Sequence, residues 1–164
     1  MTEDELRKIT VGEPAVVNST ITLVDYDPEW PALFQREADR SRAALGDRVL
    51  RIEHVGSTSV AGLAAKPIID IVLVVTDTAN EEAYVPALEA LGYTLRIREP
   101  NFHEHRMFKS PDANINLHCY SNGCPEAWEH ASQIQVTVTD KDGGSDTKTF
   151  SARDFEGQGF VNLP

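Results

Sequence analysis

The sequence predicts an α/β (α+β) domain in which flanking helices cover a mixed β-sheet, followed by a hairpin-like tail. Helical and strand-like patterns alternate over the first 130 residues, and later strands follow without helices between them, which favours a mixed sheet over a doubly wound one. Residues 67–75 form an apolar run typical of a strand covered on both faces. With 164 residues the chain is long enough for one domain and short for two.

The clearest helix spans residues 28–45. Asp27 offers an N-cap, and Pro28 stands at the first helical position, where its missing N–H removes no hydrogen bond. Apolar residues then recur at helical spacing, and Gly46 stands where a C-cap glycine belongs. We therefore expect a helix from residue 28 to residue 45.

Two shorter helices are also predicted. The first covers 59–64 and ends before Pro67, because a residue that precedes proline avoids the α region. The second covers 79–91, where Thr78 offers a cap at the start and Gly92 closes the end.

Six segments are predicted to be strands. These segments are 21–24, 49–54, 67–75, 93–98, 105–109 and 115–120. The segment 110–114, Ser-Pro-Asp-Ala-Asn, has the composition of a turn.

The two ends of the chain differ from the central domain, 19–130. Residues 1–18 are polar without a clear period, which predicts a loose arm. Residues 131–164 form a tail that departs in character from the rest. Within it, 133–139 alternates polar with apolar residues, and a turn-forming segment precedes 147–150. We expect a β-hairpin in this tail.

The composition argues against several classes of function. The chain carries 26 acidic and 15 basic residues, a net charge of −11, which disfavours general nucleic-acid binding and membrane-surface binding. An anionic small substrate would need a local cluster of basic side chains. No apolar run is long enough for a transmembrane helix, the N-terminus lacks the apolar segment of a secretory signal, and two cysteines make no disulfide framework. We expect a cytoplasmic protein.

The most informative residue is Asp70, which interrupts the apolar run. A carboxylate there is costly to desolvate unless it is paired, hydrogen-bonded or metal-bound. Two interpretations stay open. Asp70 binds a metal or substrate, or it is a buried acid paired with Lys66 or with a backbone group.

A Gly-Ser pair, Gly56-Ser57, leaves the preceding strand before Asp70. Such a pair can bind a phosphate through backbone N–H groups at a helix start. The plainer alternative is a strand-to-helix turn capped by Ser57 or Thr58. We expect the bend and Asp70 to converge on one pocket.

Basic and imidazole side chains complete the candidate set. Lys66, Arg106 and Lys109 are the cations best suited to meet an anion in this acidic chain, with solvated edge-strand charge as the alternative. His118 is a candidate polar site residue, and His54 is equally consistent with packing and with a site.

Several histidines and cysteines raise the question of zinc. The candidates are His103, His105 and His118 together with Cys119, Cys124 or His130. No recognised zinc spacing occurs among them, so we expect partly exposed strand histidines rather than a zinc centre.

Four segments carry a family resemblance: V-D-Y-D-P-E-W-P-A-L-F (24–34), R-I-E-H-V-G-S-T-S-V-A-G-L-A-A-K-P-I-I-D-I (51–71), L-G-Y (91–93) and N-L-H (116–118). Over about 20–130 the chain resembles the GrpB (UPF0157-like) family, which is placed by similarity in the nucleotidyltransferase superfamily with its polymerase-β-like fold. The resemblance implies a small mixed sheet, with Gly-Ser opening a helix and a catalytic-type acid on the next strand.

The match to the active superfamily pattern, hG[GS] followed by Dh[DE]h and a third acid on a later strand, is partial. Gly56-Ser57 and Asp70 match it, but Val72 stands at the second acid, and Asn116 and His118 occupy the later strand. Two-metal phosphoryl transfer needs several carboxylate oxygens around Mg²⁺. Family members also usually continue into C-terminal helices, whereas this tail looks like a strand pair.

These observations lead us to expect a protein that binds a nucleotide or other phosphorylated small molecule and transfers a nucleotidyl group with Mg²⁺ or Mn²⁺. The expected residues are Asp70 and His118 for catalysis, Asp70 for the metal, and Gly56, Ser57, Thr58, Lys66 and Arg106 for the ligand. The alternative is a non-catalytic ligand-binding or protein-interaction module that has lost the metal-binding acids. Because relatives of the family occur fused to dephospho-coenzyme A kinase, the resemblance also implies an association with that enzyme.

Overall fold

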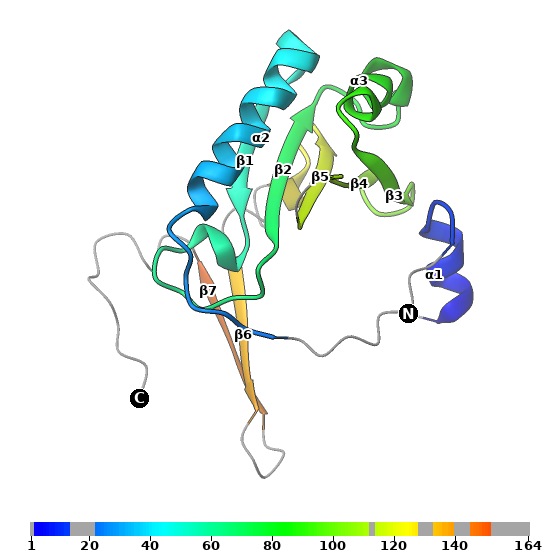
Figure 1. Ribbon diagram of the computed structural model, residues 1–164. Helices are drawn as coiled ribbons and strands as arrows, with labels where there is room; N and C mark the ends of the chain where they lie inside the picture. The colour runs from blue at the N-terminus through cyan, green and yellow to red at the C-terminus, as the bar shows by residue number, and fades with distance from the viewer. Residues whose placement is uncertain (1, 14–21, 112–113, 128–132, 140–144, 152–164) are drawn as a thin grey trace.

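A mixed five-stranded sheet forms the centre of the molecule. The computed structural model describes residues 2–13, 22–111, 114–127, 133–139 and 145–151 (Figure 1). The strands are β1 (Arg51–Val55), β2 (Ile69–Val75), β3 (Thr94–Glu99), β4 (His105–Lys109) and β5 (Ile115–Ser121). Their order in the sheet is β1-β2-β5-β4-β3; β2 and β5 are parallel, and the other neighbours are antiparallel. The predicted mixed sheet is therefore confirmed.

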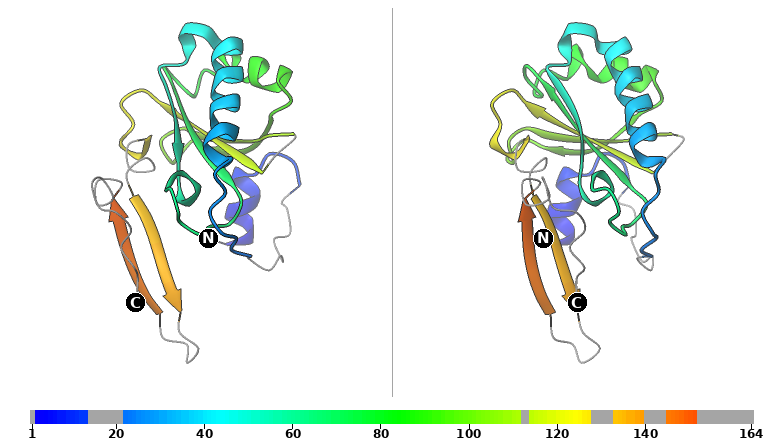
Figure 2. Two further views of the ribbon diagram at one scale, coloured as in Figure 1. Left: turned by 60° about the vertical axis from the view of Figure 1, so that its left-hand side comes forward. Right: turned by 90° about the vertical axis from the view of Figure 1, so that its left-hand side faces the viewer.

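Two helices cover one face of this sheet. Helix α2 (Trp30–Leu45) contacts β1 and β2, and α3 (Val85–Ala90) contacts β3 (Figure 2). The sheet side chains under them include Ile71, Leu73 and Leu117, all fully buried. This apolar layer is the main core, because burial of such side chains supplies most of the stabilisation of a small domain.

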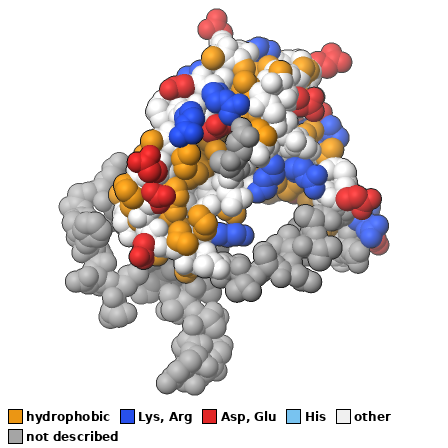
Figure 3. Space-filling view, in the orientation of Figure 1, with side chains coloured by type: hydrophobic (Ala, Val, Ile, Leu, Met, Phe, Trp, Pro, Cys, Tyr) orange, Lys and Arg blue, Asp and Glu red, His pale blue; other side chains and the backbone are white. Residues whose placement is uncertain are grey.

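The opposite face carries a smaller apolar cluster beside polar side chains. Its members are Val55, Val72, Val74, Tyr120, Cys124 and Ala127. The strand β2 is thus buried on both faces, as its continuous apolar run predicted. Elsewhere on the surface, hydrophobic side chains lie among charged ones (Figure 3), and the large exposed ones among the described residues are Leu23, Val24, Leu50 and Phe102.

Helix α2 closely follows the predicted span. The N-cap is Glu29 rather than Asp27, but the Asp27 carboxylate still accepts a hydrogen bond from the Glu29 N–H at 2.9 Å. At the other end Gly46 caps the helix with a φ of 57°, a conformation that glycine adopts without a Cβ clash.

The expected loose arm over 1–18 is wrong for its first part, which forms helix α1 (Glu3–Ile9). Thr2 and Glu5 make a capping box, with the Thr2 hydroxyl accepting from the Glu5 N–H at 3.2 Å and the Glu5 carboxylate from the Thr2 N–H at 2.6 Å. A seven-residue helix is too short to display an apolar period, so only its cap residues signalled it.

The two short predicted helices are also corrected. In place of 59–64 the chain makes one 3₁₀ turn, η2 (Ser57–Ser59). The predicted 79–91 helix splits into η3 (Glu81–Ala83) and α3, because Tyr84 leaves helical geometry with a φ of −140° and Pro86 lacks an N–H. Thr78 does not cap this segment; its hydroxyl pairs with that of Ser121 at 2.9 Å.

The tail contains the predicted hairpin. Strands β6 (Gln133–Thr139) and β7 (Ser145–Ser151) pair antiparallel in a second sheet, and the turn expected between them lies outside the described residues. The predicted strand 21–24 is described only from residue 22, and Val24 forms a single bridge to Ala65 there. Among the described residues, no helix has the length and apolar character needed to cross a membrane.

An ion cluster joins η3 to strands β3 and β4. The Glu81 carboxylate accepts from Arg98 Nε at 2.7 Å and from Arg106 Nε at 2.6 Å. The hydrogen bond from Arg98 lowers the pKa of Glu81 most. Burial raises this pKa, but the hydrogen bond from Arg106 lowers it further, so that it lies at about 2. Only 4% of the Arg106 side chain is exposed, so this charge depends on its acidic partners.

Removing the Glu81 charge should therefore destabilise the fold. We expect Glu81→Gln to lower the free energy of unfolding at pH 7 by on the order of 1–3 kcal/mol. Since the folded pKa lies below the ordinary value of 4.5, the carboxylate contributes stability above pH 4.5 that is lost as the pH falls toward 2. The variant should lose this part of the acid dependence. Urea unfolding at pH 7 and pH 3 measures both effects. The control is Glu82→Gln at the exposed neighbouring residue, and an equal loss of unfolding free energy in that variant would contradict the role given to Glu81.

Candidate functional site

The Gly-Ser bend and the lone acid of β2 meet in the structure. Gly56 has φ 73° and ψ −172°, a region open essentially to glycine alone. A Cβ added to Gly56 would lie 3.0 Å from Asp70 Oδ2, so the backbone of the bend rests directly against the carboxylate. The bend follows Val55, and Val55 pairs with Asp70 in the antiparallel ladder of β1 and β2. This pairing brings the bend and Asp70 together, as expected.

One row of side chains crosses the sheet at the level of Asp70. The pairing register places Val55, Asp70, Asn116, Lys109 and Thr94 side by side on five successive strands. Residues directly opposite in a sheet point to the same face. The Asn116 amide donates from Nδ2 to Asp70 Oδ1 at 2.8 Å, which orients the carboxylate.

A chain of imidazoles extends from Asp70 across the same face. His118 Nε2 lies 3.5 Å from Asp70 Oδ1, His118 Nδ1 lies 3.0 Å from His105 Nε2, and His105 Nδ1 lies 2.6 Å from Glu99 Oε2. Three contacts join the Asp70 carboxylate to the Glu99 carboxylate through the two rings, and each contact needs one proton to be a hydrogen bond. Two neutral imidazoles carry only two N–H groups. Filling every link therefore takes one additional proton, which gives the pair a capacity to hold or pass a proton beside Asp70.

The charges around Asp70 favour its ionised form. Burial opposes ionisation, but hydrogen bonds from His118 and Asn116 outweigh it, and the pKa of Asp70 lies below its ordinary value. Lys109 contributes in the same direction. Burial lowers the pKa of Lys109, aided by nearby Lys66, while Asp70 opposes that shift. Lys109 thus lies near both the Asp70 carboxylate and Lys66, which precedes β2 in the chain.

Thr58 holds the bend in place, because its hydroxyl forms hydrogen bonds within the protein. The side chain is buried, and its Oγ1 donates to the Ile68 carbonyl at 3.0 Å and lies 3.0 Å from His54 Nε2. The His54 ring also stacks on Phe34, with ring centroids 5.2 Å apart. Both His54 and Thr58 therefore position the bend, whereas half-buried Ser57 and exposed Lys66 remain the candidates for ligand contact.

The structure does not bring Arg106 to this site. Arg106 pairs in register with Cys119, whose side chain lies in the helix-covered core, and its guanidinium binds Glu81 and Glu104. It therefore faces away from Asp70. Strand alternation was the available signal: Lys109 lies three residues along β4, an odd number, and so shares the Asp70 face that Arg106 leaves.

The structure also rearranges the histidine and cysteine candidates. His105 and His118 contact each other, while Cys119 lies on the opposite face of the sheet, so these three do not converge. His130 lies outside the described residues. Asn116 and Glu99 were absent from the predicted site; the spacing of Asn116 two residues before His118 on one strand could have indicated the first.

Comparison with known proteins identifies the family. A family model described as GrpB protein matches residues 20–143. The chain belongs to the GrpB family. This match extends past residue 130, where the resemblance seen in the sequence ended, and reaches into the tail.

Several relatives carry the same region. A UPF0157 protein of Halalkalibacterium halodurans is 62% identical over 125 residues, which cover 76% of this chain and 64% of that protein. A UPF0157 protein of Streptomyces coelicolor is 44% identical over 120 residues, 73% of this chain and 61% of that protein. A dephospho-CoA kinase of Mycolicibacterium paratuberculosis is 38% identical over 124 residues, 71% of this chain and 29% of that protein. The GrpB chain thus spans less than two thirds of the length of these relatives.

A solved structure shares the fold. The crystal structure of conserved protein GrpB from Enterococcus faecalis aligns with a TM-score of 0.57 and 31% sequence identity, covering 64% of each chain. The α/β architecture of this GrpB chain is therefore that of its family, and it is consistent with a nucleotidyltransferase-like core.

The contact between the bend and Asp70 can be tested by adding a methyl group. Gly56→Ala should lose roughly 1–3 kcal/mol from its backbone conformation alone and more from the contact with Asp70 Oδ2. Gly46→Ala, with φ 57° and no atom within 4 Å of the added Cβ, should show only the backbone cost. In an Asp70→Ala background the excess cost of Gly56→Ala should disappear, as urea unfolding measures. An excess that persists without the carboxylate would contradict the contact.

Proposed function

We propose that this GrpB-family chain binds a nucleotide or another phosphorylated small molecule at the bend and Asp70, and transfers a nucleotidyl group with the help of a divalent cation. The observation that carries the proposal is the close approach of the Gly56 backbone to Asp70 Oδ2. A glycine bend lets a phosphate approach the backbone, and the adjacent carboxylate can hold a cation bound to that phosphate.

Lysines near the carboxylate supply the positive charge that an anionic ligand needs. Lys109 lies in the same row as Asp70, and Lys66 is close enough to Lys109 to affect its pKa. The chain as a whole carries a net charge of −11, so a phosphate would be attracted by this local pair rather than by the general field. Gly56 and Ser57 would contact the phosphates, with the lysines neutralising their charge.

The metal would be Mg²⁺ or Mn²⁺ with Asp70 as its protein ligand. Mg²⁺ is often held by one or two carboxylates together with phosphate oxygens of the substrate. The donor set fits this arrangement: Asp70 Oδ1 accepts from Asn116, and Oδ2 faces the bend where the phosphate would lie. The cation would neutralise charge on the phosphates.

His118 is the proposed acid–base residue. In the neutral tautomer whose Nδ1–H donates to His105, His118 Nε2 is unprotonated and would accept the proton of an acceptor hydroxyl while that oxygen bonds to the α-phosphorus and the bond to the departing pyrophosphate breaks. His105 and Glu99 would orient the His118 ring and share the proton that it gains.

A second candidate function is a non-catalytic ligand-binding or protein-interaction module. The observation that favours it is Val72, which stands at the second acid position and is fully buried in the apolar cluster of that face. A two-metal centre would need a carboxylate there. Since similar chains are named dephospho-CoA kinase, the module would associate with that enzyme.

A thermal-shift experiment separates the two. A nucleoside triphosphate at about 100 times its Kd should raise Tm by roughly 5–10 °C, because a ligand that binds only the native state stabilises it. If the proposal holds, the shift requires Mg²⁺ or Mn²⁺ and is lost in Asp70→Asn but kept in the exposed control Asp47→Asn. A shift without metal favours the module, and the absence of any shift with nucleotides and other phosphorylated compounds contradicts ligand binding at this site.

A further inference from the structure

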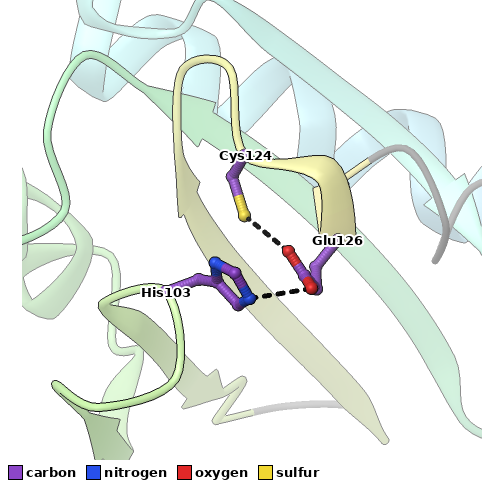
Figure 4. A group of neighbouring side chains, drawn as sticks. All are labelled: His103, Cys124 and Glu126. Carbon is purple, nitrogen blue, oxygen red and sulfur yellow. Dashed lines mark hydrogen bonds and ion pairs between the residues drawn. The ribbon is translucent and has the colours of Figure 1, made fainter.

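A second group of side chains combines three different metal-binding atoms. Figure 4 shows His103, Cys124 and Glu126 pointing toward one another. His103 Nε2 lies 2.8 Å from Glu126 Oε1, and Cys124 Sγ lies 3.3 Å from Glu126 Oε2. One ligand atom of each residue lies within 4.8 Å of both others. No residue of this group takes part in the Asp70 site.

The sheet brings these distant residues together. His103 lies in the loop between β3 and β4, and the other two follow β5, which pairs with β4. His103 and the next residue, Glu104, both have a φ of 52°, a conformation uncommon for non-glycine residues. After β5, a turn at Gly123 with φ 82° leads into Cys124, whose N–H donates to the Ser121 carbonyl at 3.1 Å.

The spacing of these atoms suits one small cation. In a tetrahedral zinc site with bonds of about 2.0–2.3 Å, neighbouring ligand atoms lie roughly 3.3–3.6 Å apart. The 3.3 Å between Cys124 Sγ and Glu126 Oε2 lies in that range. The 2.8 Å between His103 Nε2 and Glu126 Oε1 is a hydrogen-bond distance, which would lengthen by about 0.5 Å when both atoms bind zinc. Imidazole and thiolate are ligands for Zn²⁺ and are poor ligands for Mg²⁺, so the group differs in chemistry from the Asp70 site.

We propose that His103 Nε2, Cys124 Sγ and the Glu126 carboxylate form a zinc site with its fourth position open to water or an exogenous ligand. Three protein ligands with one open position is the arrangement of zinc centres that bind and activate small molecules. His103 is 44% exposed and Glu126 21% exposed, which leaves a path to solvent, whereas Cys124 is buried. When the sulfur binds zinc, the thiol proton leaves to solvent.

His103 and Cys124 were among the zinc candidates of the sequence, but they follow no recognised zinc spacing, and Glu126 was not among those candidates. Cys124 and Glu126 are two residues apart, and His103 precedes them by a whole hairpin of the sheet. The simpler interpretation of the geometry is a hydrogen-bonded group in which Glu126 accepts from the thiol and from the imidazole. The two interpretations differ in whether the thiolate binds metal.

Cobalt(II) substitution in the 164-residue chain distinguishes the two interpretations. The wild-type protein should bind one Zn²⁺ or Co²⁺ per chain at this site, and the Co²⁺ form should absorb through sulfur-to-cobalt charge transfer. Cys124→Ser should abolish that absorption and weaken Zn²⁺ binding by more than about 100-fold, and Glu126→Gln should weaken it. Thermal unfolding of the metal-free variants shows whether each of them folds.

One control variant separates this site from the proposed nucleotide site. Asp70→Asn should leave the cobalt spectrum unchanged, because Asp70 is not one of the three proposed zinc ligands. The other thiol, Cys119, is fully buried in the core, so a thiolate band is not expected from it. Charge-transfer absorption that persists in a folded Cys124→Ser variant, or a wild-type protein that binds Co²⁺ without a thiolate band, would overturn the proposal.

Discussion

The parallel pairing of β2 with β5 is the constraint from which the rest of the structure follows. These two central strands are flanked by antiparallel neighbours, and Ile71, Val72 and Leu73 of β2 are fully buried between two apolar layers. A shift of one residue would turn each of these side chains to the wrong face, so burial specifies the register. The same register sets Asp70 beside Asn116 and brings His118 within reach.

The two faces of the sheet have different roles: one carries the main core, and the other carries the candidate site. The face under α2 and α3 carries the main core and, at its edge, the cluster of Glu81 with Arg98 and Arg106. The other face carries the polar rows, with Asp70 at one end and the His103 group beyond the opposite ends of β4 and β5. Side chains on this face combine a small apolar cluster with titratable groups, which permits chemistry without exposing the main core.

Sequence patterns predicted most of the sheet and only part of the site. Strand β2 and helix α2 were predictable because long apolar periods dominate them. The split of 79–91 had one sequence signal, Pro86, which lies inside the helical spacing, and α1 was too short to show a period. Gly56 and Asp70 were found because each breaks a local pattern. The His105–His118 chain depends on the register between strands, which no single segment reveals. Alternation along β4 does show that Arg106 and Lys109 face opposite sides of the sheet.

The paramagnetism of Mn²⁺ can show whether the Gly56-Ser57 bend and Asp70 form one binding pocket. Amide signals of the isotope-labelled protein would be recorded during titration with Mn²⁺ and a nucleoside triphosphate. We expect selective broadening at Gly56, Ser57 and Asp70, with smaller effects at Asn116 and Lys109, because a bound ion would lie beside the bend. Broadening confined to other parts of the chain, or none with nucleotide present, would contradict a shared pocket for the bend and the carboxylate.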